Sequence, residues 1–295
     1  MLDPRALRMF LAVCREGTIS GAARRLNISQ PSVSVAITQL ERSLGAQLFE
    51  RSRTGIQLTE EGLALQRRAE AMDALLHDAE TEVRLAKEGV LGPLRIGGTP
   101  GALVSLLPSA LRRLEERYPS FSIHVLERPD SELAEMLRRN EIELAFVTTG
   151  LEEPPEDLEE EGFASDPFAL IVGKRNDRLP AKMSLKQAES LRWILPEARG
   201  GFRRQVDALF ASAEVAIPRD VLRCDSLLTT KAIVRDGPRV TILPRGVVAA
   251  EVSIGVLRAI TLKEALFDRR IGVRRLRNGR LSLLAKALLE AVPLP

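Results

Sequence analysis

The stretch from Ser20 to Glu41, SGAARRLNISQPSVSVAITQLE, predicts two short helices joined by a tight turn. Ser20 is a favourable N-cap for the first helix, because its hydroxyl can accept a hydrogen bond from an amide that the helix leaves free. Asn27 tolerates the left-handed conformation that ends helices. Ser29 then caps the second helix, and Pro31 falls in its first turn, where a missing amide costs nothing. We therefore predict a helix-turn-helix unit.

In such a unit the second helix enters the DNA major groove, with its N-terminal residues nearest the base edges. The candidate DNA-binding residues on this helix are Ser29, Gln30, Pro31, Ser32 and Ser34. Gln30 can form a paired hydrogen bond with adenine, and the serines suit bases or phosphates. The alternative is a small helical hairpin packed in a core. The DNA-binding interpretation is favoured because the caps, the turn and the polar leading face occur together.

The segments on either side extend this unit. Asp3 and Pro4 begin a scaffold helix that ends near Gly17, while residues 48–50 and 56–58 predict two short strands of a hairpin. Arg51 and Arg53 lie at or near the hairpin tip, where a narrow minor groove attracts guanidinium groups; the alternative is a solvated loop. Together these elements form a winged helix-turn-helix over residues 1–58.

Residues 59–88 predict a long helix that begins after the N-cap Thr59. Its apolar residues recur in steps of four and three, which is a heptad seam, at Leu65, Ala69, Met72, Leu76, Ala79, Val83 and Ala86. We predict a dimerisation helix that pairs through Leu65, Met72, Leu76 and Val83. The alternative is that the seam packs onto its own chain.

Beyond a hinge at residues 89–93, strands alternate with helices, which is typical of an α/β unit with a largely parallel sheet. A second such unit begins near Phe163, and two α/β lobes bind small molecules in the cleft between them. The candidate effector-binding residues are Thr99, Pro100, Gly101, Thr148, Thr149, Gly201 and Phe202. The helix start at Thr99 favours an anion such as a carboxylate, whereas the alternative for each residue is ordinary turn chemistry. We expect the acidic run 159–161 to be a solvated loop.

The run from Ala22 to Gly62, AARRLNISQPSVSVAITQLERSLGAQLFERSRTGIQLTEEG, resembles the signature of the LysR-type transcriptional regulators. The resemblance implies a winged helix-turn-helix DNA-binding domain, a long dimerisation helix and an α/β two-lobed effector domain like the periplasmic binding proteins. Two positions depart from the family pattern. Val35 and Ala36 stand where the family often has Arg-Gln, so base reading relies more on the other residues. Arg239 stands where the family has glycine, and is either a ligand contact or, as we favour, a solvated charge.

The family topology also implies that the last stretch returns to the first lobe. We therefore expect lobe I to comprise residues 94–162 and 268–295, and lobe II to comprise residues 163–267. The expected partners are double-stranded DNA, a small-molecule effector and further copies of the chain in a homodimer or homotetramer. RNA polymerase is a further candidate partner.

Composition is compatible with this function and excludes others. The net charge of +3 divides into +4 for residues 1–58, −4 for residues 59–88 and +3 for the rest, so the helix-turn-helix end is basic, as phosphate binding requires. His77 and His124 are the two histidines, and no hydrolase or phosphate-binding loop motif is present, which argues against an enzyme, a metal site or a cofactor. A free-standing solute-binding protein would share the two-lobed fold but lack residues 1–88.

Cys14 and Cys224 are too few for a disulfide framework, and we expect each to be a small buried hydrophobe rather than a redox sensor. The sequence shows neither an N-terminal export signal nor a run of 18 apolar residues. We therefore expect a cytoplasmic protein with no membrane partner.

Overall fold

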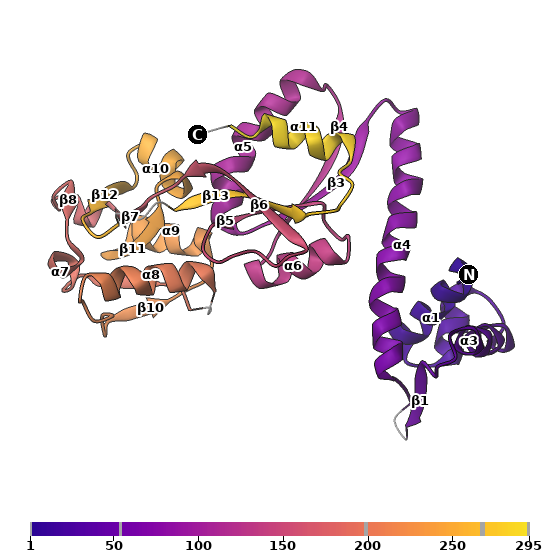
Figure 1. Cartoon of the computed structure of the whole chain (residues 1–295). Coiled ribbons are helices and arrows are strands. Elements are labelled where there is room, and N and C mark those ends of the chain that lie inside the picture. The colour runs from indigo at the N-terminus through magenta and orange to yellow at the C-terminus, as the bar shows by residue number, and fades with distance from the viewer. Residues whose placement is uncertain (1, 53–54, 198–199, 266–268, 294–295) are drawn as a thin grey trace. The chain divides into compact units, whose positions relative to one another are not determined.

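A computed structural model describes residues 2–52, 55–197, 200–265 and 269–293 (Figure 1). Its contacts divide the chain into two compact units, Met1–Glu88 with Arg139–Glu141, and Gly89–Arg138 with Ile142–Pro295. Each unit has its own buried apolar clusters. Among the described residues, no helix is long and apolar enough to cross a membrane.

The N-terminal unit begins with three helices, α1 (Pro4–Glu16), α2 (Ile19–Leu26) and α3 (Gln30–Leu44). Asn27 takes the predicted left-handed conformation, with φ of 55°, and Ser29 caps α3. The cap of α2 differs from the prediction, because Thr18 Oγ1 accepts the hydrogen bond from Gly21 N at 3.0 Å. Helical geometry starts directly after the extended Thr18, so Ser20 already lies inside the helix.

The predicted wing is present as β1 (Phe49–Ser52) paired antiparallel with β2 (Gly55–Leu58). Its base is fixed to the helices by the Phe10 and Phe49 rings, whose centroids are 5.1 Å apart, and by Glu41 Oε1, which accepts from Leu48 N at 2.9 Å. The backbone of Arg51 belongs to β1. The Arg51 side chain and the whole of Arg53 lie outside the described residues, so their contact with DNA stays a prediction.

Helix α4 (Glu60–Lys87) begins at Thr59, whose Oγ1 accepts from Gly62 N at 2.9 Å. The predicted apolar seam divides along this helix. Leu65 and Met72 pack against the core of the N-terminal unit, whereas Val83 is 63 % exposed. The self-packing alternative therefore describes the first half of the seam, whereas Val83 in the second half does not pack against its own chain. Leu76 is half-buried between these two parts.

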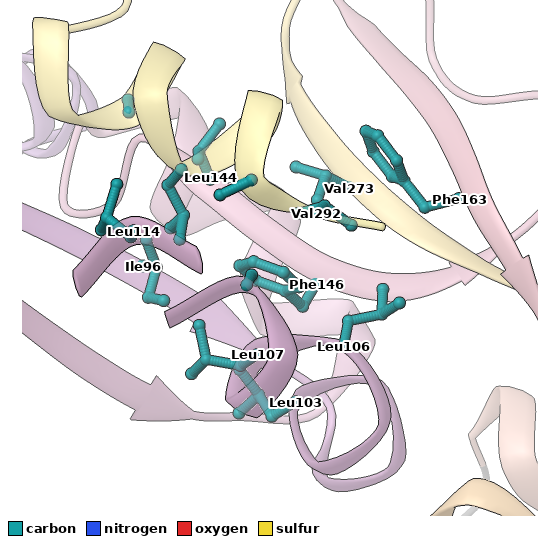
Figure 2. Packing of buried hydrophobic residues seen from close by; sticks show 14 of the residues in the cluster. Ile96, Leu103, Leu106, Leu107, Leu114, Leu144, Phe146, Phe163, Val273 and Val292 are labelled. Carbon is teal, nitrogen blue, oxygen red and sulfur yellow. The ribbon is translucent and has the colours of Figure 1, made fainter. Parts of the chain in front are cut away.

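The second unit contains two sheets, and the first is a five-stranded sheet with strand order β4-β3-β5-β13-β6. Its strands are β3 (Leu91–Gly98), β4 (Phe121–Glu127), β5 (Leu144–Thr149), β6 (Leu158–Ser165) and β13 (Arg270–Leu276), with helices α5 (Pro100–Arg117), α6 (Asp130–Arg138) and α11 (Leu283–Ala291). Strand alternation on β5 turns Phe146 into the cluster with α5 and α11, and turns Val147 into the cluster with α6. Figure 2 shows Phe146 between residues of α5 and the neighbouring strands.

Three expectations for this lobe need correction. Strand β3 begins at Leu91, inside the predicted hinge, and β6 extends the sheet to Ser165, so the lobe boundary near Phe163 falls within a strand. The acidic run 159–161 is part of β6 rather than a solvated loop. It pairs with β13 because Glu159 and Glu160 lie opposite Arg275 and Arg274, which neutralise their charge.

The second sheet has strand order β10-β9-β11-β7-β12-β8. It comprises β7 (Phe168–Val172), β8 (Lys182–Met183), β9 (Arg192–Leu195), β10 (Val221–Arg223), β11 (Arg239–Pro244) and β12 (Arg258–Leu262), together with α7 (Leu185–Ala188), α8 (Gly201–Ser212), α9 (Leu227–Asp236), α10 (Ala249–Ser253) and the 3-10 helices η1 (Lys174–Asn176) and η2 (Gly246–Val248). The chain then returns to the first sheet through β13, as the family resemblance implied.

Arg239 is not the solvated charge that we favoured, because its side chain is largely buried. Its Nη1 donates to the carbonyl of Trp193 at 2.7 Å, and its Nη2 lies 3.0 Å from Asp220 Oδ1. The side chain therefore joins strand β11 to strand β9 and the segment that precedes β10.

Candidate functional site

Helix α3 presents the predicted polar surface. Ser29, Gln30, Pro31, Ser32 and Ser34 are exposed, while Val33, Ile37 and Leu40 turn inward at helical spacing. The Ser29 and Ser32 hydroxyls are 2.7 Å apart, so these two groups are partly committed to each other. Val35 is 54 % exposed on the same helix and adds an apolar group to this surface.

A cavity of about 530 Å³ lies between the two lobes of the second unit. Its walls come from the ends of strands and the starts of helices in both sheets. They include the start of α5, the start of α8, the segments after β4 and β5, and residues of β11 and α9. This is where an open α/β sheet places ligands.

Six of the seven predicted effector residues line this cavity, namely Thr99, Pro100, Gly101, Thr148, Gly201 and Phe202. Thr149 does not. Adjacent residues of a strand point to opposite faces, so Thr149 is buried, 7 % exposed, and its Oγ1 lies 3.3 Å from where a Cβ on Gly162 would be. The Thr149 side chain therefore belongs to the interior of the sheet.

The helices differ in whether a side chain accepts a hydrogen bond from the amides at their start. Amides without such a cap can instead bind a ligand. Side chains cap the starts of α1, α2, α3, α4, α9 and α11. No side chain caps α5, whose N-cap is Thr99, or α8, whose N-cap is Gly200. Both of these uncapped starts lie in the cavity wall. Free amides at a helix start, together with the helix dipole, favour an anion.

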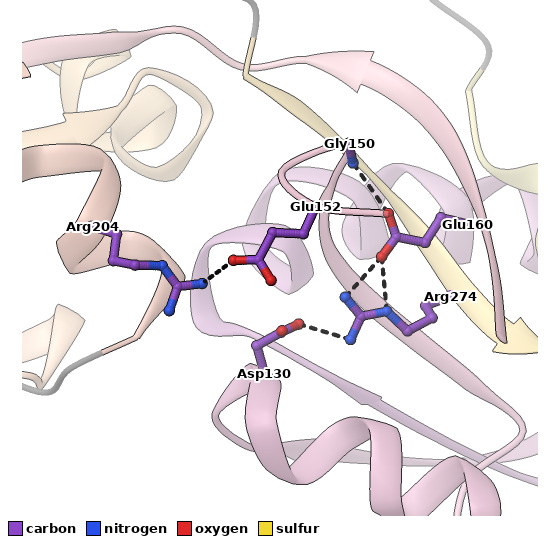
Figure 3. Close-up of polar contacts among 6 residues, drawn as sticks. All are labelled: Asp130, Gly150, Glu152, Glu160, Arg204 and Arg274. Atoms are coloured by element: carbon purple, nitrogen blue, oxygen red, sulfur yellow. Dashed lines mark hydrogen bonds and ion pairs between the residues drawn. The ribbon is translucent and has the colours of Figure 1, made fainter. Parts of the chain in front are cut away.

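Charged residues that the sequence did not identify as part of a site form three groups at the cavity, and Figure 3 shows two of them. Arg274 is almost buried and pairs with Glu160 at 2.7 Å and Asp130 at 3.1 Å. Glu160 also accepts from Gly150 N at 3.1 Å. The second group is an exposed ion pair between Arg204 on α8 and Glu152 after β5, at 3.1 Å, which joins the two lobes.

A third group centres on Arg269, whose side chain is only 4 % exposed. Its Nη2 donates to Thr148 Oγ1 at 3.0 Å, and its Nη1 lies 3.5 Å from Asp166 Oδ2. Burial lowers the pKa of this guanidinium, and the Asp166 carboxylate opposes that effect. Because the partners of Arg269 lie more than 100 residues away in sequence, no local pattern could have indicated this group.

The two cysteines lie in different surroundings, Cys14 within the N-terminal unit and Cys224 in the second unit. Burial, with a contribution from the Glu70 carboxylate, raises the pKa of the Cys14 thiol to about 12, so this thiol is neutral at physiological pH. Cys224 lies in the cavity wall. Within the part of the chain that the structure describes, no cluster of His, Cys, Asp and Glu side chains could hold a metal ion.

A winged helix-turn-helix unit followed by a two-lobed domain with a ligand-sized cavity defines a class of ligand-responsive DNA-binding regulators. Residues 4–63 match the bacterial regulatory helix-turn-helix proteins of the lysR family, and residues 87–293 match the LysR substrate binding domain. The chain belongs to the LysR family of transcriptional regulators, as the resemblance of the run from Ala22 to Gly62 predicted.

Individual relatives agree with this assignment. The chain is 33 % identical to the transcriptional regulator TdfR and 32 % identical to the regulator TfdS, both from Cupriavidus pinatubonensis, each over 252 residues that cover 84 % of both sequences. Among solved structures, full-length CbnR in complex with its target DNA has a TM-score of 0.73 at 22 % identity, covering 99 % of each chain. LysG from Corynebacterium glutamicum, with bound effector arginine, has a TM-score of 0.62 at 21 % identity and covers 100 % of each chain. These structures confirm the predicted fold class.

Proposed function

We propose that this LysR-type regulator reads DNA through the N-terminal residues of α3 and changes its DNA binding when a small carboxylate occupies the cavity between its lobes. The carrying observation is that the uncapped helix starts of α5 and α8 both lie in the wall of that cavity. A ligand oxygen can accept hydrogen bonds from amides that no side chain satisfies.

Side-chain charge alone would not select a carboxylate. The wall contains five arginines (Arg128, Arg203, Arg204, Arg269 and Arg274) and six acids (Glu127, Asp130, Glu152, Glu153, Glu160 and Asp225). Most of these arginines are already paired, as in the groups of Arg274 and Arg204. The uncapped helix starts add a preference for an anion that the side-chain charges alone do not give.

The exposed part of the α4 seam supports the assembly of two chains. Val83 is 63 % exposed and Leu75 is 53 % exposed, although both are large apolar residues on a long helix. Pairing of such helices would remove these side chains from water and would bring two α3 helices to one DNA site. We propose a homodimer as the minimal DNA-binding form, and a homotetramer would add a second pair.

An effector can change DNA binding only if it binds one arrangement of the lobes better than another. Such coupling is typically about 1–3 kcal/mol, which corresponds to roughly a 5- to 150-fold change in affinity. Occupancy of the cavity would supply this difference because its walls come from both lobes.

The test combines DNA selection with a ligand screen. Duplexes selected from a random pool should share a roughly palindromic sequence, and a screen of carboxylates should yield a compound that raises the melting temperature. At a hundredfold excess over Kd, a ligand adds about 2.7 kcal/mol of stability. The same compound should change the affinity for the selected duplex. Failure to select any sequence would overturn DNA reading by α3.

The screen needs a matched control for the helix start. Thr99→Val keeps the shape of the side chain but removes its hydroxyl. This variant should bind the stabilising compound more weakly, so the compound should raise its melting temperature less. Thr149→Val is the control, since the neighbouring threonine lies outside the cavity wall. Equal loss in both variants would show that the compound binds elsewhere.

A further inference from the structure

Arg269 is a buried cation with hydrogen-bonding capacity left over. Its side chain is 4 % exposed, yet its Nε and Nη1 have no hydrogen-bond partner among the described residues. Nη1 does lie 3.5 Å from Asp166 Oδ2, which is an ion-pair distance. A buried charged donor without a partner is costly, and an anion that reached this guanidinium would offset part of that cost.

Asp166 makes no hydrogen bond with either of these donors, and its two oxygens accept from other groups. Its Oδ2 accepts from Ser105 Oγ at 2.8 Å, and its Oδ1 accepts from Gly246 N at 2.8 Å. The ring of Phe168 covers one face of the guanidinium, with its centroid 5.6 Å from the Arg269 Cζ. The donors that remain lie in the plane of the guanidinium, which is the plane in which it binds a carboxylate.

Arg269 also lies beside the uncapped start of α5. A Cβ added to Gly101 would be 3.4 Å from Arg269 Nη2, and the same Nη2 donates to Thr148 Oγ1. Gly101, Thr148 and Arg269 all belong to the cavity wall. The guanidinium and the helix start therefore favour negative charge at the same place, and two independent features agree.

The position of Arg269 in the fold connects this place to both lobes. Asp166 follows β6 and Arg269 precedes β13, so both lie where the chain crosses between the sheets, and Asp166 N donates to the carbonyl of Arg269 at 2.9 Å. Asp166 also binds Ser105 on α5 of the first lobe and Gly246 in η2 of the second. An anion at Arg269 would therefore contact the segment through which the lobes are joined.

We propose that Arg269 anchors the effector and that the group it holds is a single carboxylate. This inference rests on the proposed ligand-binding function and names the residue and the charge. Asp166 offsets the full charge of Arg269, so the helix start, equivalent to roughly half a positive charge, supplies the remaining attraction. That amount suits a monoanion and leaves a dianion such as sulfate poorly neutralised.

The test uses acetate as the probe on the full chain. The variants remove the negative charge of Asp166 alone, or the charges of Asp166 and Arg269 together. Asp166→Asn leaves Arg269 without its counter-charge, and should lower the Kd for acetate at least tenfold relative to the unchanged protein. The double variant Asp166→Asn with Arg269→Gln has neither charge, so it avoids a lone buried ion and should lose acetate binding. Arg113→Gln, an exposed arginine on α5, controls for non-specific anion binding and should leave the Kd within twofold.

Acetate and sulfate are compared at equal ionic strength by the rise in melting temperature. Acetate binding by the double variant with the unchanged protein's Kd would overturn the role of Arg269. Sulfate stabilising as strongly as acetate would overturn the single-carboxylate assignment. These outcomes can be told apart from failure of the proposed function, because DNA selection is measured separately. A protein that selects no DNA sequence would not be a regulator, whether or not it binds acetate.

Discussion

The surface of α3 and the cavity between the lobes place functional side chains in opposite ways. On α3 the polar residues are exposed above a separate apolar core, and they follow one another in sequence. At the cavity, the side chain of Arg269 is buried and that of Arg274 is nearly so; both lie in the cavity wall and pair with residues far away in sequence. Substitution on α3 should therefore change function without unfolding, whereas substitution at the cavity should change both.

Helix α4 offers the largest expected effect and separates stability from assembly within one element. Met72→Glu places a charge against the N-terminal core and should cost about 2–4 kcal/mol of unfolding free energy, as large core substitutions do. Val83→Glu alters an exposed residue and should leave that stability within about 0.5 kcal/mol. Chemical denaturation followed by circular dichroism measures both.

The same pair tests the dimer. Val83→Glu should shift the protein towards a monomer in light scattering while its N-terminal unit stays folded. A dimer that survives Val83→Glu at micromolar concentration would show that the exposed part of α4 does not hold the two chains together.

Two adjacent glutamates on β6 test how much burial adds to the stability that an ion pair provides. Glu160→Gln weakens the nearly buried pair with Arg274 and should cost about 2 kcal/mol of unfolding free energy, somewhat less than breaking a fully buried pair. Glu159→Gln weakens the more exposed pair with Arg275 and should cost less than about 1 kcal/mol. Equal costs in thermal or urea unfolding would mean that burial does not distinguish the two pairs.

The α3 surface predicts the reverse behaviour. Gln30→Ala should reduce discrimination between the selected DNA site and its variants by about 1–3 kcal/mol if Gln30 pairs with a base, while the melting temperature stays unchanged. Gln39→Ala is the control, because Gln39 is exposed on the same helix but far from its N-terminus. Fluorescence anisotropy with matched and mismatched duplexes measures the effect, and equal discrimination in all three proteins would remove Gln30 from base reading.

The contrast also explains which parts the sequence could predict. Caps, helical spacing and the turn at Asn27 are local, so the helix-turn-helix and the start of α4 were predicted close to their observed bounds. Thr99 and Gly201 were found because strand-to-helix turns are local as well. The error at Ser20 came from Thr18, an equally good cap two residues earlier.

What the sequence could not predict depends on pairing between distant segments. Glu160 looked like a loop residue because its partner Arg274 lies 114 residues away on β13. The residues of the Arg269 group come together only when the chain has crossed between the lobes twice, at Asp166 and at Arg269. The division of the α4 seam is invisible for the same reason, since Met72 has the spacing of a dimer contact whether or not its own chain covers it.

The smallest expected effect concerns the two cysteines. Because one lies in each region, a single thiol reagent can compare how accessible and how reactive the two regions are. The Cys14 thiol has a pKa raised to about 12 by burial in the N-terminal unit, from an ordinary value of 9.0. Its neutral form thus contributes stability that is fully present below pH 9 and is lost as the pH rises towards 12. In Cys224→Ser at pH 8, Cys14 should react with a thiol reagent at least about a hundredfold more slowly when folded than in urea, because the thiolate is the reactive form. In Cys14→Ser, the half-buried Cys224 in the cavity wall should react faster than Cys14 does in the folded Cys224→Ser protein. If Cys14 reacted equally fast in folded and unfolded Cys224→Ser, that result would refute the burial that raises its pKa.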